Sequence, residues 1–215
     1  MLLETIRNTV IETARRARRD KLVTLTFGNF SMRDRDTGYV CITPSGLDYD
    51  SLLPEDIVVV DLHGNTVNGH RRPSIELPLH LEVYKRRPDV MAVVHTHSVF
   101  ATAWAACRKD IPAAVAEVAM VAGGPIRCAP YRTVGSYELA RTAVDTLEDK
   151  SIVLLANHGV LAVGPDMDSA YVNAVVAEEG ARIAFYAQQI GTIAAIDEEE
   201  CRSLIRVARD KYGQK

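Results

Sequence analysis

The sequence predicts an α/β fold in which helices pack on a mixed, largely antiparallel sheet. Strand patterns and helix patterns are interspersed along all 215 residues, with no internal repeat, linker or low-complexity segment. Early strand patterns are separated only by hairpin-length turns such as His63-Gly-Asn65, and connections this short join antiparallel neighbours. We therefore expect one domain over residues 1–215 rather than a doubly wound parallel sheet.

The first part of the chain predicts a helix, a set of short strands and a second helix. Leu3, Ile6 and Val10 recur at helical spacing, which predicts a helix over residues 1–19 with one buried stripe. β-Branched and aromatic residues predict strands that stop at Gly, Pro or Asn. These strands are 23–27, interrupted by Gly28-Asn29 and resuming over 30–32, then 39–43, 57–62 and 66–67. A helix follows Pro73-Ser74 and runs to Tyr84 or Lys85, with Ser74 as its N-cap.

The second part predicts further buried strands and longer helices. The expected strands are one beginning at Met91, then 126–130, 152–156 and 160–163. The expected helices are 99–107, 137–147, 168–189 and a last one beginning at Asp197. Asp197 and Glu200 have the spacing of a capping box, which marks the start of that last helix.

Composition and charge exclude several classes of protein. The chain is 47% hydrophobic and 25% charged, as in ordinary globular domains, and its net charge of −3 lacks the basic surface of a nucleic-acid-binding protein. No apolar run approaches the ~20 residues that span a membrane. The four cysteines lie far apart in the sequence, so a disulfide framework is not expected. We therefore expect a cytoplasmic location.

The strand that begins at Met91 ends in two histidines. Side chains alternate between the two faces of a strand, so His95 and His97 point to one side and Thr96 to the other. Their ring nitrogens can therefore reach a common point, which makes half of a metal site. The alternative is that two polar residues merely mark the end of a buried strand.

Two more residues can complete such a site. His158 follows the buried strand 152–156 and precedes Gly159, which lets the backbone turn and a ligand approach. Three histidine ligands with an open position are typical of a catalytic zinc site. Glu76 is expected near the start of a helix, where the dipole favours its charged form, and it could be a ligand or a general base. An ordinary first-turn charge is the alternative. His80 lies four residues later on the same helix face.

Three loops have the composition of a phosphate-binding surface. They supply small residues, hydroxyl groups and backbone N–H groups, which can bind phosphate without a basic residue. The loops are Thr26-Phe-Gly28-Asn29, Thr43-Pro-Ser45-Gly46 and Pro73-Ser74. Each of them taken singly could equally be a plain turn.

Seven short motifs, in order and over nearly the whole chain, resemble the class II aldolase/adducin family. The motifs are Gly28-Asn29-x-Ser31, Thr43-Pro-Ser-Gly46, Pro73-Ser-x-Glu76-x-x-x-His80, Arg87-Pro-Asp-Val90, His95-Thr-His97-Ser98, Cys128-Ala-Pro-Tyr131 and Asn157-His-Gly159. The family includes L-fuculose-1-phosphate aldolase and L-ribulose-5-phosphate 4-epimerase. The resemblance implies a three-layer α/β/α fold with a mixed, largely antiparallel central sheet, and a cyclic homotetramer with active sites between subunits.

The resemblance also implies a site and a reaction. It implies one Zn²⁺ per subunit on His95, His97 and His158, with Glu76 as fourth ligand and as the acid/base. The residues that match the family's substrate-phosphate loops are Gly28, Asn29, Ser45, Gly46 and Ser74. Tyr212 matches the setting of a C-terminal proton donor. The implied reaction is zinc-dependent cleavage of a sugar or deoxysugar 1-phosphate, like L-fuculose 1-phosphate, into dihydroxyacetone phosphate and an aldehyde.

The chain departs from the family pattern at three places. Ile75 stands where the family usually has a second phosphate-binding serine, and Ala116 or Glu117 stands where the fuculose enzyme has a tyrosine from the neighbouring subunit. The epimerase has an aspartate where this chain has Glu76. Its second catalytic aspartate would fall near Met120 of this chain. The glutamate favours an aldolase.

Two alternatives to an aldolase remain. One is an epimerase, decarboxylase or dehydratase that uses the same metal on a related sugar phosphate or sugar acid. The other is a non-catalytic scaffold like the adducin head, which the retained histidines and Glu76 disfavour.

Overall fold

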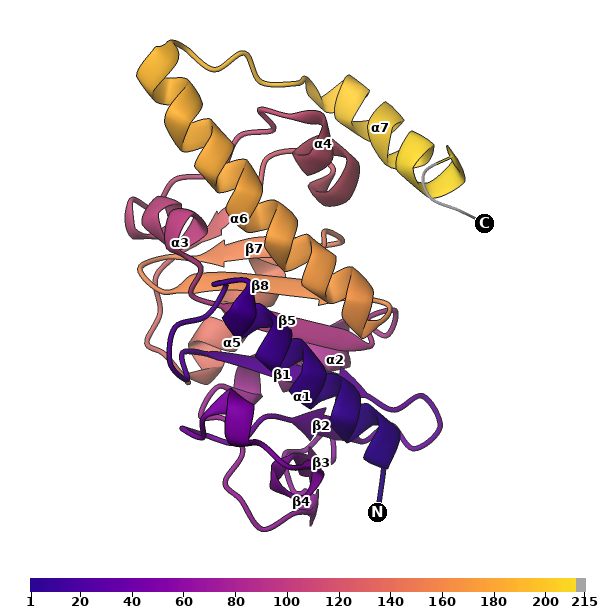
Figure 1. Ribbon diagram of the computed structural model, residues 1–215. Helices are drawn as coiled ribbons and strands as arrows, with labels where there is room; N and C mark the ends of the chain where they lie inside the picture. The colour runs from indigo at the N-terminus through magenta and orange to yellow at the C-terminus, as the bar shows by residue number, and fades with distance from the viewer. Residues whose placement is uncertain (212–215) are drawn as a thin grey trace.

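The computed structural model describes residues 1–211, which form an eight-stranded sheet with helices on both faces (Figure 1). The strands are β1 (Gly28–Arg33), β2 (Val40–Ile42), β3 (Val58–Val60), β4 (Thr66–Asn68), β5 (Ala92–Thr96), β6 (Cys128–Ala129), β7 (Ile152–Leu155) and β8 (Gly159–Gly164). The helices are α1 (Glu4–Arg19), α2 (Leu77–Arg86), α3 (Val99–Ala106), α4 (Ala116–Ala122), α5 (Tyr137–Leu147), α6 (Met167–Ile190) and α7 (Glu198–Lys211), with short 3-10 helices η1 (Tyr49–Ser51) and η2 (Pro54–Asp56).

The strand order is β4-β3-β2-β1-β5-β8-β7-β6, and every neighbouring pair is antiparallel except β6 and β7. The prediction of a mixed, largely antiparallel sheet is therefore confirmed. The two central strands, β1 and β5, pair so that Asn29 lies opposite His95. This register places the first histidine of the two-histidine strand beside the Gly28-Asn29 motif.

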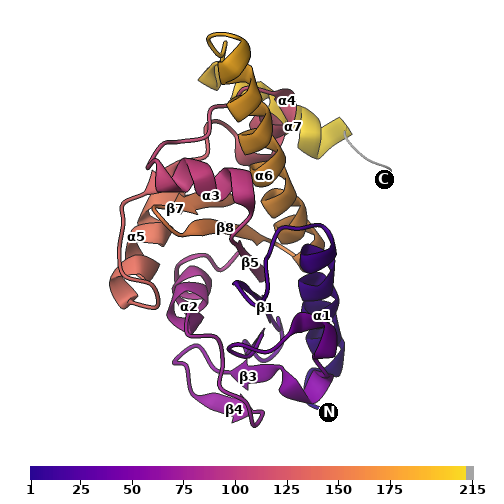
Figure 2. The ribbon, with the colours of Figure 1, turned by 60° about the vertical axis from the view of Figure 1, so that its left-hand side comes forward.

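Helices cover the sheet in two layers, with α1 and α6 on one face and α2 and α5 on the other (Figure 2). Alternation along β5 decides which residues face which layer: Val93 packs in the α2/α5 core, whereas Ala92 and Val94 pack in the α1/α6 core. His95 therefore points toward the α2 layer, where Glu76 lies at the start of α2. A third cluster of buried residues joins α3, α4, α6 and α7 beyond β7.

The predicted strand over residues 23–27 is wrong, and β1 begins at Gly28, where a loop had been expected. Leu25 adopts a φ of 53°, in the left-handed region, which ends any strand there. Val23 is buried, but Leu25 and Phe27 are both more than half exposed, so the apolar run does not fill a core. Gly28 is required because a Cβ there would lie 2.6 Å from Val23 Cγ1 and 2.9 Å from the His95 carbonyl oxygen.

Two smaller predictions also need correction, and one helix was missed. Ser74 is not the N-cap of α2: the helix begins at Leu77 with Glu76 as N-cap, and Ser74 Oγ instead accepts the Glu76 N–H at 3.2 Å. The strand expected over 126–130 is only the two residues of β6. The helix α4 had no predicted counterpart. In the described residues, no helix is long and apolar enough to cross a membrane.

Candidate metal centre and active site

Four side chains from three parts of the fold meet at one end of the central strands. His95 is on β5, His97 lies just after it, His158 is in the turn between β7 and β8, and Glu76 caps α2. One ligand atom of each residue lies within 4.8 Å of all the others. The structure thus brings together all four residues that the sequence predicted as metal ligands.

The closest approaches in this cluster are between nitrogen and oxygen atoms that a cation would share. His95 Nε2 lies 2.9 Å from His97 Nε2 and 3.1 Å from Glu76 Oε2, and His158 Nε2 lies 3.3 Å from Glu76 Oε1. The three imidazole rings are 4.7 to 4.9 Å apart between centroids and inclined to one another by 61 to 79°. The rings therefore converge on a point instead of stacking.

The tautomer of His95 is fixed by the backbone. Its Nδ1 lies 2.8 Å from the Val160 carbonyl oxygen, which can only accept, so Nδ1 carries the proton. In neutral His95, the lone pair of Nε2 then faces a carboxylate oxygen of Glu76. Two hydrogen-bond acceptors would therefore face each other with no proton between them. Either a second proton or a cation must lie between them. A backbone carbonyl behind a histidine is the usual second partner of a metal-binding imidazole.

The ionisation of the cluster follows from burial and from mutual charge. Burial, together with a smaller effect of the neighbouring His95, lowers the pKa of His158 to about 3 and that of His97 to about 4. Burial raises the pKa of Glu76, but the charge and the hydrogen bond of His95, with smaller contributions from His158 and Asn29, outweigh it, so the carboxyl pKa lies well below its ordinary value. Burial opposes protonation of His95, yet the Glu76 charge raises its pKa overall. Glu76 is thus a carboxylate facing two neutral imidazoles and one that readily takes a positive charge.

Two further observations show that these residues fit a divalent metal. Glu76 Oε1 is buried without a hydrogen-bond partner, although a buried charged oxygen normally has one. Gly159 leaves open the space beside the rings, because a Cβ there would lie 2.9 Å from His97 Cδ2 and 3.4 Å from His95 Cε1. Three imidazoles suit a catalytic zinc-type site, with the carboxylate at the fourth position that a substrate could take over.

The predicted phosphate loops lie side by side next to the cluster. Pro44 and Pro73 form a bridge, Ser45 N–H donates to the Arg72 carbonyl at 3.0 Å, and Ser74 N–H donates to the Thr43 carbonyl at 3.1 Å. Ser45 and Gly46 are exposed, whereas Ser74 is buried. Ile75 is 67% exposed at the same edge, so an apolar side chain replaces a hydroxyl group there.

Asn29 does not point freely toward these loops. Its Nδ2 donates to Glu76 Oε2 at 2.8 Å, and its Oδ1 lies 2.5 Å from His80 Nε2. Gly28 is tied down by its carbonyl oxygen, which accepts the Tyr49 hydroxyl at 2.5 Å. The structure therefore separates the five predicted substrate residues into an exposed pair, Ser45 and Gly46, and three that are held in place beside the centre, Gly28, Asn29 and Ser74.

Some site features had no signal in the sequence. The ring of Phe27 stacks on His97 with an interplanar angle of 2° and centroids 6.1 Å apart, and Phe27 had been assigned to a strand. The Val160 carbonyl behind His95 depends on the β5–β8 pairing and could not be anticipated. Glu117 is exposed on α4, and Tyr212 lies outside the described residues.

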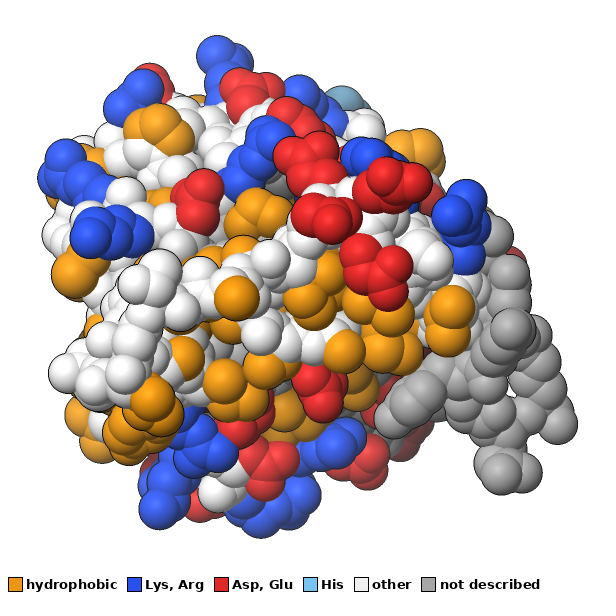
Figure 3. Space-filling model, turned by 90° about the horizontal axis from the view of Figure 1, so that it is seen from above, with side chains coloured by type: hydrophobic (Ala, Val, Ile, Leu, Met, Phe, Trp, Pro, Cys, Tyr) orange, Lys and Arg blue, Asp and Glu red, His pale blue; other side chains and the backbone are white. Residues whose placement is uncertain are grey.

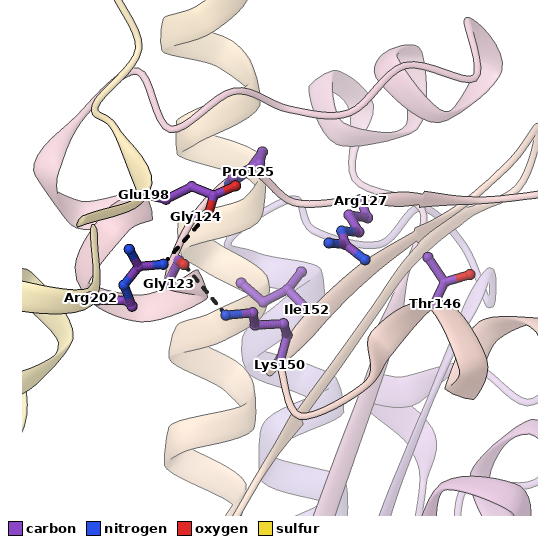
Figure 4. Close-up of a pocket in the computed structure, with 9 residues that line it drawn as sticks. All are labelled: Gly123, Gly124, Pro125, Arg127, Thr146, Lys150, Ile152, Glu198 and Arg202. Carbon is purple, nitrogen blue, oxygen red and sulfur yellow. Dashed lines mark hydrogen bonds and ion pairs between the residues drawn. The ribbon is translucent and has the colours of Figure 1, made fainter. Parts of the chain in front are cut away.

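A second pocket lies between α4, β7 and α7 and shares no residue with the cluster (Figure 4). Three cationic side chains line it, but each has a partner. Arg202 pairs with Glu198 at 3.5 Å, Arg127 pairs with Glu148 at 3.0 Å, and Lys150 Nζ lies 3.5 Å from the Gly123 carbonyl oxygen. The pocket therefore does not compete with the histidine cluster as the candidate active site.

The fold and the cluster together define an α/β enzyme whose active centre could hold a divalent metal at the end of its central strands. The family model for the Class II Aldolase and Adducin N-terminal domain matches residues 8–185. The chain belongs to this class II aldolase and adducin family, as its motifs indicated. It is a class II aldolase, an enzyme of the lyase class.

Similar proteins match most or all of the chain. A 5-deoxy-D-ribulose 1-phosphate aldolase of Bacillus thuringiensis is 37% identical over 214 residues, covering 100% of both chains. The structure of an L-fuculose 1-phosphate aldolase superposes with a TM-score of 0.94 at 35% identity, over 97% of this chain and 98% of that one. An L-fuculose-1-phosphate aldolase from Thermus thermophilus superposes with a TM-score of 0.74 at 27% identity, over 86% and 95% of the two chains.

Proposed function

We propose that this protein is a zinc-dependent aldolase that cleaves a sugar or deoxysugar 1-phosphate into dihydroxyacetone phosphate and an aldehyde. The observation that carries the proposal is the convergence of His95, His97, His158 and Glu76 on one point in a class II aldolase fold. The first three would hold Zn²⁺, with Glu76 as the fourth ligand until substrate arrives.

The bound Zn²⁺ would supply a Lewis acid that draws electron density from the substrate carbonyl group. Glu76 would accept the proton of the hydroxyl group next to the bond that breaks, because its carboxylate is ionised and its Oε1 has no other partner. The electron pair of the broken carbon–carbon bond then moves toward the carbonyl group, and a proton returns to the carbon. We assign this proton donor to Tyr212 on its match to the family motif.

The phosphate group would lie at the edge made by the exposed Ser45 and Gly46 and the buried Ser74, where two hydroxyl groups lie beside the loop backbone. Ile75 at this edge supplies no hydrogen bond, so fewer donors are available than in the family pattern. The named activity of the Bacillus thuringiensis relative, on a 5-deoxy-ketose 1-phosphate, supports a deoxysugar 1-phosphate as substrate.

An epimerase, decarboxylase or dehydratase would use the same metal on a related substrate. Glu76, rather than aspartate, and the uncharged Met120 favour the aldolase. The experiment that separates these reactions is a panel of ketose 1-phosphates and 5-phosphates, assayed for released dihydroxyacetone phosphate with and without a chelator. Release from 1-phosphates that stops on chelation is expected, and a product of unchanged carbon number would favour an epimerase or a dehydratase.

Replacing Glu76 by Gln tests the role of the carboxylate. The amide keeps the shape but cannot take a proton, so we expect kcat to fall by about 10²- to 10⁴-fold, the usual contribution of a general base. Glu82→Gln, on the same helix and paired within the described residues only with Arg86 at 3.9 Å, is the matched control. Turnover that persists in Glu76→Gln, with zinc still bound, would contradict this role.

We also propose that the protein is a cytoplasmic homotetramer. A hydrophobic surface at the C-terminal end of α6 supports the assembly: Phe185, Tyr186 and Ile190 are exposed there, and Phe100 packs against both aromatic rings. Figure 3 shows hydrophobic side chains gathered across this end of the molecule between charged groups. Exposed apolar patches of this kind are typical of subunit interfaces. Sedimentation equilibrium would give a tetramer mass, and a monomer would contradict the proposal.

A further inference from the structure

A row of buried polar side chains runs from Glu76 into the core between β1 and α2. Asn29 and Ser31 are two residues apart on β1, while Glu76, His80 and Tyr84 are four apart along α2. Two strand residues advance about 6.6 Å and four helix residues about 6 Å, so the two rows stay in step. We call these five side chains the polar ladder.

Each neighbouring pair in the polar ladder is within hydrogen-bond distance. Asn29 Nδ2 donates to Glu76 Oε2 at 2.8 Å, and Asn29 Oδ1 lies 2.5 Å from His80 Nε2. Ser31 Oγ lies 2.6 Å from His80 Nδ1 and 2.8 Å from the Tyr84 hydroxyl. All five side chains are buried, and His80 has no exposed surface.

The proton positions in the polar ladder follow from Glu76. A carboxylate can only accept, so the Asn29 amide must turn its NH₂ group toward Glu76 and its oxygen toward His80. His80 Nε2 must then carry the proton, which leaves Nδ1 to accept the Ser31 hydroxyl, and Ser31 in turn accepts from Tyr84. This arrangement needs a neutral His80, and burial does lower the pKa of His80 to about 3.

The far end of the polar ladder shows that it is not a proton channel. Tyr84 is 1% exposed, and burial raises the pKa of its hydroxyl above the ordinary value. The ladder therefore ends at a buried side chain in the core between the sheet and the α2/α5 layer. Burying five polar groups where apolar residues would pack is unfavourable unless the groups pair with one another. A paired network of this kind can hold a side chain at its end, here Glu76, in a fixed orientation.

We propose that His80 is a positioning residue that locks the Asn29 amide, so that Asn29 holds Glu76 Oε2 and leaves Oε1 free to face the metal site. Asn29 is thereby assigned to the carboxylate and not to the substrate phosphate. The expected change in kcat rests on the proposed function, whereas the expected change in the geometry of the metal site does not. Its effect should appear in kcat and in the geometry of the metal site, with KM for the phosphate substrate unchanged.

Two replacements of His80 separate its two hydrogen bonds. In His80→Gln the amide nitrogen can take the place of Nε2 and still donate to Asn29. In His80→Asn the shorter amide can replace only Nδ1, so the bond to Asn29 is lost. We expect kcat of His80→Asn to fall about 10- to 100-fold, as for other groups that orient metal ligands, and His80→Gln to recover most of the rate.

Readouts that do not depend on turnover use the cobalt-loaded protein. In His80→Asn we expect an altered visible absorption spectrum of Co²⁺ and faster removal of the metal by a chelator, whereas His80→Gln should resemble the unmodified protein. Tyr84→Phe breaks only the last bond, so its effect on both readouts should be smaller than that of His80→Asn. His63→Asn, the same change at an exposed turn, is the matched control.

The proposal is overturned if His80→Gln is as impaired as His80→Asn, or if His80→Asn lowers thermal stability while kcat and the cobalt spectrum stay unchanged. A rise in KM with kcat unchanged would return Asn29 to phosphate binding and also overturn it. If the unmodified protein releases no dihydroxyacetone phosphate, the proposed function fails, but the cobalt spectra and chelation rates still decide the role of His80.

Discussion

Gly159 is the residue on which the spacing of the three histidines depends most directly. It follows His158 and starts β8, and a Cβ at this position would lie 2.4 Å from the Thr96 carbonyl oxygen and 2.9 Å from His97 Cδ2. Real Cβ atoms do not approach backbone oxygen so closely, so any larger residue must push β8 and β5 apart. The glycine is needed for close approach and not for an unusual backbone angle.

Gly159→Ala should therefore damage the metal site more than its small size suggests. Relieving the clash requires a backbone shift between β5 and β8, which we expect to lower the free energy of unfolding by about 1–3 kcal/mol, as overpacking of a core does. We also expect weaker metal binding, measured as metal content after dialysis. Gly191→Ala is the control, since nothing lies within 4 Å of a Cβ there. Full metal content and unchanged stability in Gly159→Ala would contradict the prediction.

The residues of the centre differ in how visible they are in the sequence. His95 and His97 are evident because strand alternation alone places them on one side, and Glu76 and His80 share a helix face by their spacing of four. The pairing of His80 with Asn29 and Ser31 requires the β1–α2 packing, which no local pattern encodes. Local sequence patterns thus identify the candidate ligands, whereas the orientation of their side chains depends on tertiary contacts.

At the scale of elements, the failed strand over residues 23–27 shows why apolar composition misleads near the site. The segment is rich in β-branched and aromatic residues, yet Leu25 has a left-handed backbone conformation. The ring of Phe27 stacks on His97 instead of packing in the core. Helix α4 was missed for a different reason. Its alanine-rich sequence carries little helical periodicity, and it is held by packing on α6 and α7.

The contact between α4 and α6 depends on a glycine inside a helix. Gly180 lies in α6, where alanine would ordinarily stabilise by about 1 kcal/mol. Here a Cβ would lie 2.4 Å from Val118 Cγ2, on α4. We expect Gly180→Ala to lower stability by about 1–3 kcal/mol because the two helices must separate.

A double-mutant cycle tests this contact. Val118→Ala removes the methyl groups that meet the new Cβ, so the double variant Gly180→Ala/Val118→Ala should be more stable than the sum of the two single effects predicts. Urea unfolding of the four proteins measures the coupling. Additive effects would mean that Gly180 is not a packing requirement of the α4–α6 contact.

At the scale of the whole molecule, the sheet connects the two halves of the chain at the site. The first half supplies β1 and Glu76, the second half supplies β8 and His158, and β5 between them carries His95. Hairpin-length turns were enough to predict antiparallel neighbours within the first half. The central β1–β5–β8 order, which creates the site, joins strands distant in sequence and could be expected only from the family resemblance.

The same convergence makes the stability of the metal-free protein depend on pH. Three imidazoles, two buried and one half-buried, have folded-state pKa values below the ordinary 6.5: the half-buried His97 at about 4, and His80 and His158 at about 3. As pH falls below 6.5, the unfolded chain takes up these protons first, so the folded state loses stability. His95 acts in the opposite direction, because its pKa is raised. Three groups against one give a net loss on acidification.

We therefore expect the melting temperature of chelator-treated protein to fall steadily between about pH 6.5 and about pH 4.5, before most carboxyl groups titrate. Glu76 contributes little in this window because its pKa lies below the ordinary value of 4.5. Zinc at the proposed site should raise the melting temperature throughout, because the four candidate ligands converge only in the folded state, and its effect should shrink in acid as protons compete for the imidazoles. In His80→Gln one of the three opposing imidazoles is gone, so the decline should be shallower. A melting temperature that stays level or rises on acidification would mean that the imidazoles are protonated in the folded metal-free protein.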